Sequence, residues 1–403
     1  MIIDRLPPIG FLLGSGVSLP FAPGTRELTD EVLFHADRYY LHTDEEWYRR
    51  PGEAAGDRQS PREKRVSQLI GNLSARVNAY YMGRVDAKGC PDRWCNYEDI
   101  GYHADAIAST LNRNRDDPGL MPLAMEVCRD LGCTPEELLQ IAHDTVGLVR
   151  DIAFRRLVDV KPPKDHLRVV VEAALDPDVD SLPIYTLNHD CLLEDTFAAE
   201  GISLFDFRRT DGTGRVLLDL DTAAPPETRA ILYKPHGSVR WRRFRPMTPG
   251  RGADPWFSEW IGWHRDEHGS RHDEGDRWRS IGGPLILVGR FNKELEYLDA
   301  PYWSTFCALE GSLRSLRRLV ISGYGFGDRA INTLLINWIY ARPQGERRLV
   351  VLHNDENVLL GGARGSIANK WDQWRSQGIL QWIPKFPCEY SWPQLKQILR
   401  EMG

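Results

Sequence analysis

The chain has 403 residues, of which 42% are hydrophobic and 27% are charged, and its formal net charge is −6. This is globular composition, long enough for one large domain with an insertion or for two domains. The acidic balance gives no support to direct binding of nucleic acid. Seven cysteines, a small and odd number, suit reduced thiols in a cytoplasm, and no signal peptide or apolar run of membrane-spanning length is found.

The first apolar run, Ile9–Leu13, reads as a short buried strand that ends at the turn Gly14-Ser15-Gly16. A P-loop would need a lysine and a hydroxyl residue after its last glycine, and Val17-Ser18-Leu19 follows here. The common dinucleotide fingerprint would have a third glycine at Leu19. The turn therefore fits close backbone approach to a phosphate, and a strand-to-helix turn without a ligand stays open as the alternative.

Helical periodicity dominates the chain as far as about residue 175. Apolar residues recur at helical spacing over residues 25–41, and again over residues 66–175, where no convincing strand interrupts the pattern. Thr134, followed by Pro135 and two glutamates, is a typical helix start. Between these stretches, residues 42–65 are polar, charged and rich in helix breakers, which predicts an exposed loop.

The period changes near Leu182. The short apolar runs LPIYTLN, ILYKPHG, PLILVG, RLVISGYGF and RRLVVLHND each end in Gly, Asn or Asp, and helix-like segments separate them. Strands alternating with helices indicate a parallel sheet covered on both faces, and we expect the strand near Ile9 to join it. The fold class is therefore α/β, a Rossmann-like sheet with a helical insertion. We divide the chain into 1–60 and 179–403 for the sheet domain and 61–178 for the insertion.

Polar residues gather where these predicted strands end, which is the place where ligands bind in open α/β sheets. They include Asn188 and Asp190 after one strand, His236 and Ser238 after another, Gly323, Tyr324, Gly325 and Asp328 after a third, and Asn354 and Asp355 after a fourth. Taken singly, each could be a helix cap or a plain turn. Their joint placement at one sheet edge favours a binding site.

The order of these motifs resembles that of the SIR2 (sirtuin) superfamily. The motifs that carry the resemblance are Gly14-Ser15-Gly16-Val17-Ser18, Thr186-Leu187-Asn188-His189-Asp190, His236-Gly237-Ser238, Gly323-Tyr324-Gly325-Phe326 and Asn354. The helical residues 66–175 lie outside the deacylase pattern and resemble the helical insertion of bacterial SIR2-like immune effectors.

The resemblance implies that NAD is bound as a substrate. It assigns catalysis to Asn188, His236 and Asp190. It assigns cofactor binding to Gly14, Ser15, Gly16, Ser18, Thr186, Gly237, Gly323, Tyr324, Gly325 and Asn354. In this interpretation the backbone amides of Gly14–Val17 hold the pyrophosphate at a helix N-terminus.

Two departures from the family pattern separate the chain from sirtuin deacylases. Their structural zinc module needs two pairs of cysteines after the catalytic histidine, and residues 239–283 contain no cysteine. We therefore predict no structural zinc, and interpret the pairs Cys90/Cys95 and Cys128/Cys133 as ordinary thiols and His264, His268 and His272 as part of a solvated loop. Leu187 stands where the family has a glutamine, which removes one amide near the ribose.

The resemblance, with these departures, implies an NAD+ glycohydrolase that acts as an effector of antiviral defence in bacteria. A sirtuin-like protein deacylase and a non-catalytic sensor of NAD or ADP-ribose are the alternatives. The resemblance implies control by oligomerisation or by a protein partner, with a HerA-type ATPase favoured over a short Argonaute complex. Residues 239–264 are rich in Trp and Arg, which fits either an interface with such a partner or a cover over the site.

Overall fold

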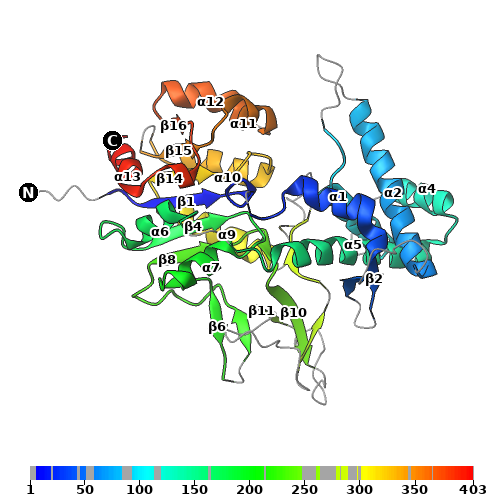
Figure 1. Cartoon of the computed structure of the whole chain (residues 1–403). Helices are drawn as coiled ribbons and strands as arrows, with labels where there is room; N and C mark the ends of the chain where they lie inside the picture. Colours follow the sequence, from blue (N-terminus) through cyan, green and yellow to red (C-terminus); the bar gives the residue numbers. More distant parts are fainter. Residues whose placement is uncertain are drawn as a thin grey trace, which may run out of the picture.

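Seven parallel strands form the central sheet, in the order β16-β15-β14-β1-β4-β8-β5 (Figure 1). They are β1 (Ile9–Leu13), β4 (Leu182–Thr186), β5 (Leu204–Phe205), β8 (Ala230–Tyr233), β14 (Arg318–Ser322), β15 (Arg348–Leu352) and β16 (Leu380–Ile383). The computed structural model describes residues 6–19, 21–42, 46–50, 59–83, 93–112, 119–161, 165–212, 215–246, 260–263, 278–281, 283–288, 297, 301–343, 346–364 and 366–402. The expected α/β fold class is confirmed.

Strand β1 lies in the middle of the sheet. Leu13 lies opposite Ser322 of β14 on one side and Thr186 of β4 on the other. The expected pairing of the first strand with strands of the second half is therefore confirmed. Because the chain continues outward in opposite directions from β1, a crevice opens at the carboxyl ends of β1, β4 and β14, where open α/β sheets bind ligands.

Helices cover both faces of the sheet because its buried strands carry apolar side chains on both. Phe11 and Leu13 contribute to a core with α6 (Arg168–Leu175), α7 (Leu192–Ala199) and α13 (Trp392–Glu401). Leu12 points to the opposite face. There it belongs to a core with α9 (Tyr302–Leu313), α10 (Arg329–Tyr340), α11 (Glu356–Gly362) and α12 (Ser366–Ser376).

A separate helical block follows β1, at the right of Figure 1. Its helices are α1 (Thr25–His35), α2 (Pro61–Met82), α3 (Tyr97–Leu111), α4 (Met121–Leu131) and α5 (Pro135–Leu157), and they share one core. The predicted start of α5 is confirmed, because Thr134 and Glu137 form a reciprocal capping box. The domain boundaries at residues 60 and 178 stay a prediction, with α1 packed in the helical core and α6 in the core of the sheet.

The expectation of an exposed loop over residues 42–65 is wrong at Trp47. The short strands β2 (Tyr39–Leu41) and β3 (Trp47–Arg49) form an antiparallel pair, and the Trp47 side chain is only 1% exposed. The Trp47 amide donates to the Asp151 carboxylate of α5 at 2.8 Å, and Arg155 donates to the Trp47 carbonyl at 2.8 Å. Trp47 is therefore a large buried side chain that packs against α5, although the residues around it in the sequence are polar.

A second, antiparallel sheet lies below the central sheet in Figure 1. It has the order β12-β10-β11-β7-β6, made of β6 (Arg208–Thr210), β7 (Val216–Leu218), β10 (Trp241–Pro246), β11 (Trp260–Trp263) and β12 (Trp278–Ile281). Trp241 and Trp263 are buried in it, with ring centroids 6.0 Å apart, so these two rings of the Trp-rich segment pack on each other.

The sequence predicted that the run PLILVG forms a strand of the central sheet, and this prediction is wrong. Its residues form β13 (Leu285–Ile286), which pairs antiparallel with β9 (Gly237–Ser238) directly after His236. This pairing holds the chain that follows His236. Among the described residues, no helix is both long and apolar enough to cross a membrane.

Candidate functional site

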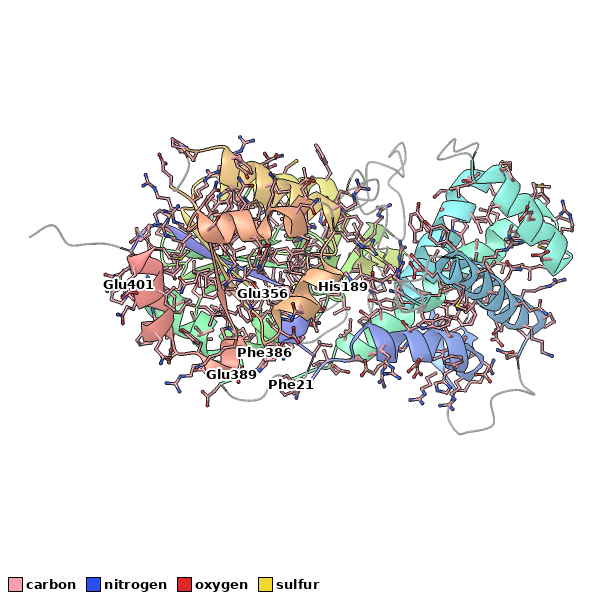
Figure 2. All side chains as sticks on the ribbon, turned by 90° about the horizontal axis from the view of Figure 1, so that it is seen from above. Phe21, His189, Glu356, Phe386, Glu389 and Glu401 are labelled. Carbon is pink, nitrogen blue, oxygen red and sulfur yellow. The ribbon has the colours of Figure 1, made fainter. Side chains whose placement is uncertain are left out.

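A cavity of about 300 Å³ lies at the carboxyl ends of β1, β4 and β14. The starts of α1 and α3 complete its wall, with Thr25, Tyr97 and Glu98. His189, one of the lining residues, lies on the side of the sheet that faces the helical block (Figure 2). The cavity brings together these residues that the sequence singled out: Gly14, Ser15, Ser18, Asn188, Asp190, His236, Gly323, Tyr324 and Gly325.

The turns after β1 and β14 are packed directly against each other. A Cβ atom on Gly16 would lie 2.6 Å from the Cα of Gly323, and Gly323 itself has a φ of +64°. The Gly14 amide donates to the Ser322 carbonyl and the Gly16 amide to the Gly323 carbonyl, both at 2.9 Å. Glycine is required here because two backbones touch.

These hydrogen bonds involve amides that were expected to hold a pyrophosphate. The Val17 amide also donates within the chain, to the Gly14 carbonyl at 3.1 Å, so the amides of Gly14, Gly16 and Val17 are occupied. Among the described residues, Ser15 alone in this turn has an amide without a backbone acceptor. Three of the four amides of Gly14–Val17 therefore stabilise the turn. Contact of the turn with a ligand stays a prediction.

Asn188 is held by the residues around it and keeps one polar atom open. Its backbone amide donates to the Thr186 hydroxyl at 3.2 Å, and its side-chain Nδ2 donates to the Ser18 hydroxyl at 2.9 Å. The residue is only 7% exposed, and its Oδ1 has no hydrogen-bond partner in the described part of the chain. A buried acceptor without a partner costs free energy, which is offset when a ligand supplies a donor.

His236 uses both of its ring nitrogens. Nδ1 lies 3.1 Å from the Leu187 carbonyl oxygen, and Nε2 lies 2.9 Å from Oδ2 of Asp328. The Tyr297 hydroxyl donates to the same Asp328 oxygen at 3.1 Å. All three side chains are buried, and His236 and Asp328 line the cavity. Leu187 therefore contacts His236 through its backbone carbonyl, and this contact does not depend on the Leu187 side chain.

Asp190 lies beside this group in a buried polar cluster. Burial raises the pKa of its carboxyl group, against the lowering effects of Lys234 and of the hydrogen bonds from Leu192 and Ser18. Lys234 is itself buried and donates to Glu194 at 2.8 Å and to the Asp190 carbonyl. The lysine thus ties the turn after β4 to helix α7, behind the cavity.

Two walls of this cavity are formed by residues that follow β4 and β14. This part of the chain is similar to a known protein family. Residues 183–379 match the family model of the SIR2-like domain. This part of the chain is therefore similar to the SIR2-like domain. The match spans Asn188, His236 and Asp328, and β1 lies outside it, although β1 pairs within the same sheet.

Solved structures of Sir2 homologues are similar to the chain at low identity. One is a complex with NAD, at 12% identity and a TM-score of 0.35, covering 98% of this chain and 90% of that one. Two others are ADP-ribose complexes of variants, one with histidine replaced by asparagine and one with serine replaced by alanine. Both share 9% identity and 98% coverage of this chain, with TM-scores of 0.33 and 0.32 and coverage of 91% and 90% of the other chain. No curated protein matches the sequence.

Several residues expected to bind cofactor do not line the cavity. Gly16 and Thr186 support the residues beside them, through the contacts given above. Gly237 has a φ of +79°, and a Cβ there would meet the Leu285 carbonyl at 2.0 Å. Asn354 is exposed after β15 and does not line the cavity. A role for these four in binding stays a prediction.

Tyr324 lines the cavity, and hydrogen bonds of its side chain hold its backbone in place. The single hydroxyl proton is shared between two acceptors, the Asp328 carbonyl at 3.0 Å and Oδ1 of Asn332 at 2.8 Å. Burial raises the pKa of this phenol well above its ordinary value, so the hydroxyl stays protonated and acts as a donor. The turn Gly323–Gly325 is thereby fastened to the start of α10.

Sequence patterns missed the partner of His236 and the contribution of the helical block. Asp328 was noted only as a polar residue at a strand end. Its position as N-cap of α10, where it accepts from the Ile331 amide at 3.1 Å, is the signal that could have placed it. Tyr97 and Glu98 could not be found in this way, because nothing in the local sequence shows that α3 reaches the cavity.

No group of three His, Cys, Asp or Glu side chains suited to a metal ion occurs among the residues that the structure describes. Burial raises the pKa of Cys95 to about 12 and that of Cys128 to about 11, so both thiols stay protonated. Cys90, His264, His268 and His272 lie outside the described residues. The absence of structural zinc stays a prediction, which elemental analysis of the purified protein would check.

Proposed function

We propose that the SIR2-like domain cleaves NAD+ with water to nicotinamide and ADP-ribose. The observation that carries the proposal is the buried Oδ1 of Asn188, which has no hydrogen-bond partner among the described residues and lies in one cavity with His236. An acceptor in this position fits a ribose hydroxyl or the attacking water. The reaction breaks the bond between the ribose C1′ and the nicotinamide nitrogen, forms a bond from C1′ to the water oxygen, and releases one proton.

The protein accelerates such a reaction mainly by positioning the reactants and by electrostatic stabilisation. Nicotinamide needs no protonation when it leaves, because departure neutralises the pyridinium charge. The protein must hold the ribose, stabilise positive charge at C1′ and accept the proton of water. In the proposed roles, Asn188 binds the ribose or the water, Asp190 orders the nicotinamide side, and His236 is the proton acceptor once it is neutral.

Purified protein incubated with NAD+, with and without an acetyl-lysine peptide, tests this function. The expected result is nicotinamide and ADP-ribose in equal amounts, formed at the same rate with or without peptide. Dependence on the peptide and formation of an acetylated ADP-ribose would instead indicate a deacylase. Tight binding of NAD+ without any product would indicate a sensor.

Variants connect this activity to the cavity. We expect Asn188→Ala and His236→Ala to lower turnover by roughly a hundredfold or more, with NAD+ affinity by calorimetry nearly unchanged. His143→Ala, on an exposed position of α5, is the matched control and should keep wild-type turnover. The comparison needs conditions in which the wild type is active. Near-normal turnover of His236→Ala there would contradict the assignment.

We further propose that this activity serves antiviral defence in bacteria, by depleting NAD+ in an infected cell. Support comes from the motif order and the helical block, which resemble those of bacterial SIR2-like immune effectors. We propose a homo-oligomer controlled by a HerA-type ATPase, with a short Argonaute complex less favoured. Cellular NAD+ measured after phage infection, with the chain expressed alone or with the ATPase, would test this role. NAD+ loss without phage or partner would argue against such control.

A further inference from the structure

The contacts of Asp328 determine which protonation states of this carboxyl group are stable. Its Oδ2 lies 2.9 Å from the Nε2 of His236 and accepts from the Tyr297 hydroxyl at 3.1 Å. Its Oδ1 accepts from the Ile331 amide at 3.1 Å, at the start of α10. Two donors outside the ring and a helix N-terminus all favour the ionised carboxylate.

The contacts of His236 then determine the protonation of the ring. Nδ1 faces a carbonyl oxygen, that of Leu187, which can only accept a hydrogen bond. Nε2 faces the ionised carboxylate of Asp328, which also only accepts. With Asp328 ionised, both contacts are satisfied only when each ring nitrogen carries a proton, which makes the ring an imidazolium.

We propose that Asp328 is a positioning residue that holds His236 as a fixed imidazolium in the resting protein. His236 can accept a proton only after Nε2 has given its own proton to solvent, while Nδ1–H stays on the Leu187 carbonyl. Asp328 therefore sets the pH at which the catalytic lone pair appears. The consequence for turnover rests on the proposed NAD+ cleavage, whereas the protonation of the ring can be measured without it.

The other titratable side chains near the His236 ring are farther from its nitrogens than Asp328 is, or are paired with each other. The His189 ring lies 6.2 Å from that of His236, between centroids, and Tyr297 lies 5.9 Å away. Asp190 lines the same cavity, and behind it Lys234 is paired with Glu194. Asp328 is the carboxylate in direct contact with a His236 ring nitrogen among the described residues, so it is the one to replace.

Asp328→Asn is the decisive substitution, because asparagine has nearly the same shape and caps a helix as well as aspartate does. Its amide can donate to Nε2, so the neutral ring becomes stable. Asp355→Asn is the matched control. Asp355 caps α11 in the same way, accepting from the Val358 amide at 3.0 Å, and it is exposed and does not line the cavity.

Nuclear magnetic resonance of protein with ¹⁵N-labelled histidine rings reads the protonation directly, with His236→Gln used to assign the signal. At about pH 8, above the reference histidine pKa of about 6.5, we expect both His236 nitrogens to be protonated in the wild type and in Asp355→Asn. In Asp328→Asn the ring should be neutral, with its titration displaced downward by about one to three pH units. A neutral His236 ring in the wild type at this pH, or the same titration in Asp328→Asn, would overturn the proposal.

Kinetics separates this inference from the proposed function. Where NAD+ is cleaved, the rise of kcat/KM with pH should move to lower pH in Asp328→Asn and stay in place in Asp355→Asn. An unchanged pH profile in Asp328→Asn would count against the proposal. If the ring behaves as expected and no NAD+ is cleaved under any condition, the proposed function fails and the positioning role stands.

Discussion

Three glycines determine how closely two strand ends of the sheet approach. Gly14 and Gly16 follow β1, Gly323 follows β14, and each would place a Cβ within 2.4–2.6 Å of the backbone of the other turn. Such a contact is far shorter than van der Waals distance, so no side chain fits without moving a strand end. The geometry of the cavity floor therefore depends on residues that have no functional group.

Gly323→Ala should destabilise the protein, and Gly325→Ala should not. Gly323 has a φ of +64° and its Cβ would lie 2.4 Å from the Val17 nitrogen, whereas nothing lies within 4 Å of a Cβ on Gly325. We expect the alanine at 323 to lower the free energy of unfolding by about 1–3 kcal/mol or more. Urea unfolding of the two variants measures this, and equal effects would contradict the packing argument.

Sequence could predict which residues gather here and not how they pair. Asn188 and His236 stood out because polar residues followed apolar runs, which places them at one edge of a parallel sheet. The hydrogen bond between His236 and Asp328 joins turns that are far apart in the chain, and no local pattern encodes it. The same holds for the glycine amides, whose acceptors belong to another turn.

At the scale of elements, α5 links the helical block to strand β3. Asp151 of this helix is 2% exposed and accepts the Trp47 amide at 2.8 Å. Burial raises the pKa of Asp151 to about 7, against the lowering effects of that hydrogen bond and of Arg242. The carboxyl group is therefore protonated in the folded protein over a range where an exposed aspartate is charged.

Asp151→Asn should remove a pH dependence of stability. Between about pH 4 and pH 7 Asp151 holds a proton in the folded wild type that it has lost in the unfolded chain, so its contribution to the free energy of unfolding falls as pH rises. The asparagine does not titrate and can still accept the Trp47 amide. We expect its stability relative to wild type to increase across this window by on the order of 1 kcal/mol per pH unit.

Urea unfolding at several pH values measures the difference between Asp151→Asn and wild type. Asp159→Asn, at an exposed position just after α5, is the control and should follow the wild-type curve. Parallel curves for wild type and Asp151→Asn would show that Asp151 ionises in the folded protein as it does in the unfolded chain.

Long elements with a clear period were predictable, and short ones were not. The five-residue strands β1, β4 and β14 are buried along their length, β15 is buried from Leu349 to Leu352, and all four could be predicted from apolar runs. The strands β9 and β13 have two residues each, so pairing with each other determines their place, and PLILVG was misassigned. Trp47 was missed because the residues around it are polar, and its burial depends on α5.

At the scale of the whole molecule, the cavity at the ends of β1, β4 and β14 lies where the central sheet meets the helical block. The sheet contributes Asn188, His236 and the glycine turns, and the helical block contributes Tyr97 and Glu98. Tyr97 is tied to α1 as well, since its amide donates to the Thr29 hydroxyl at 3.1 Å. A ligand in this cavity would therefore contact both parts.

Hydrogen exchange with and without ADP-ribose tests this arrangement. We expect slower exchange both in the turn 14–18 and at the start of α3 around Tyr97 and Glu98, because a ligand there suppresses local opening of both. Peptides from α13, which packs beside β1 at the other end of the sheet, should exchange at the same rate. Protection confined to the turns after the strands would show that the helical block does not take part.

The central place of β1 also has a consequence for synthesis on the ribosome. Ile9 pairs with Arg318, and the opposite neighbour of β1 begins only at Leu182. Translation adds about 5–20 residues per second, so β1 leaves the exit tunnel many seconds before β14 exists. Until then one of its edges has no strand to pair with, while the intervening helices, whose contacts are local, can already form. We infer that nascent chains stopped before residue 318 expose an apolar strand that molecular chaperones must shield.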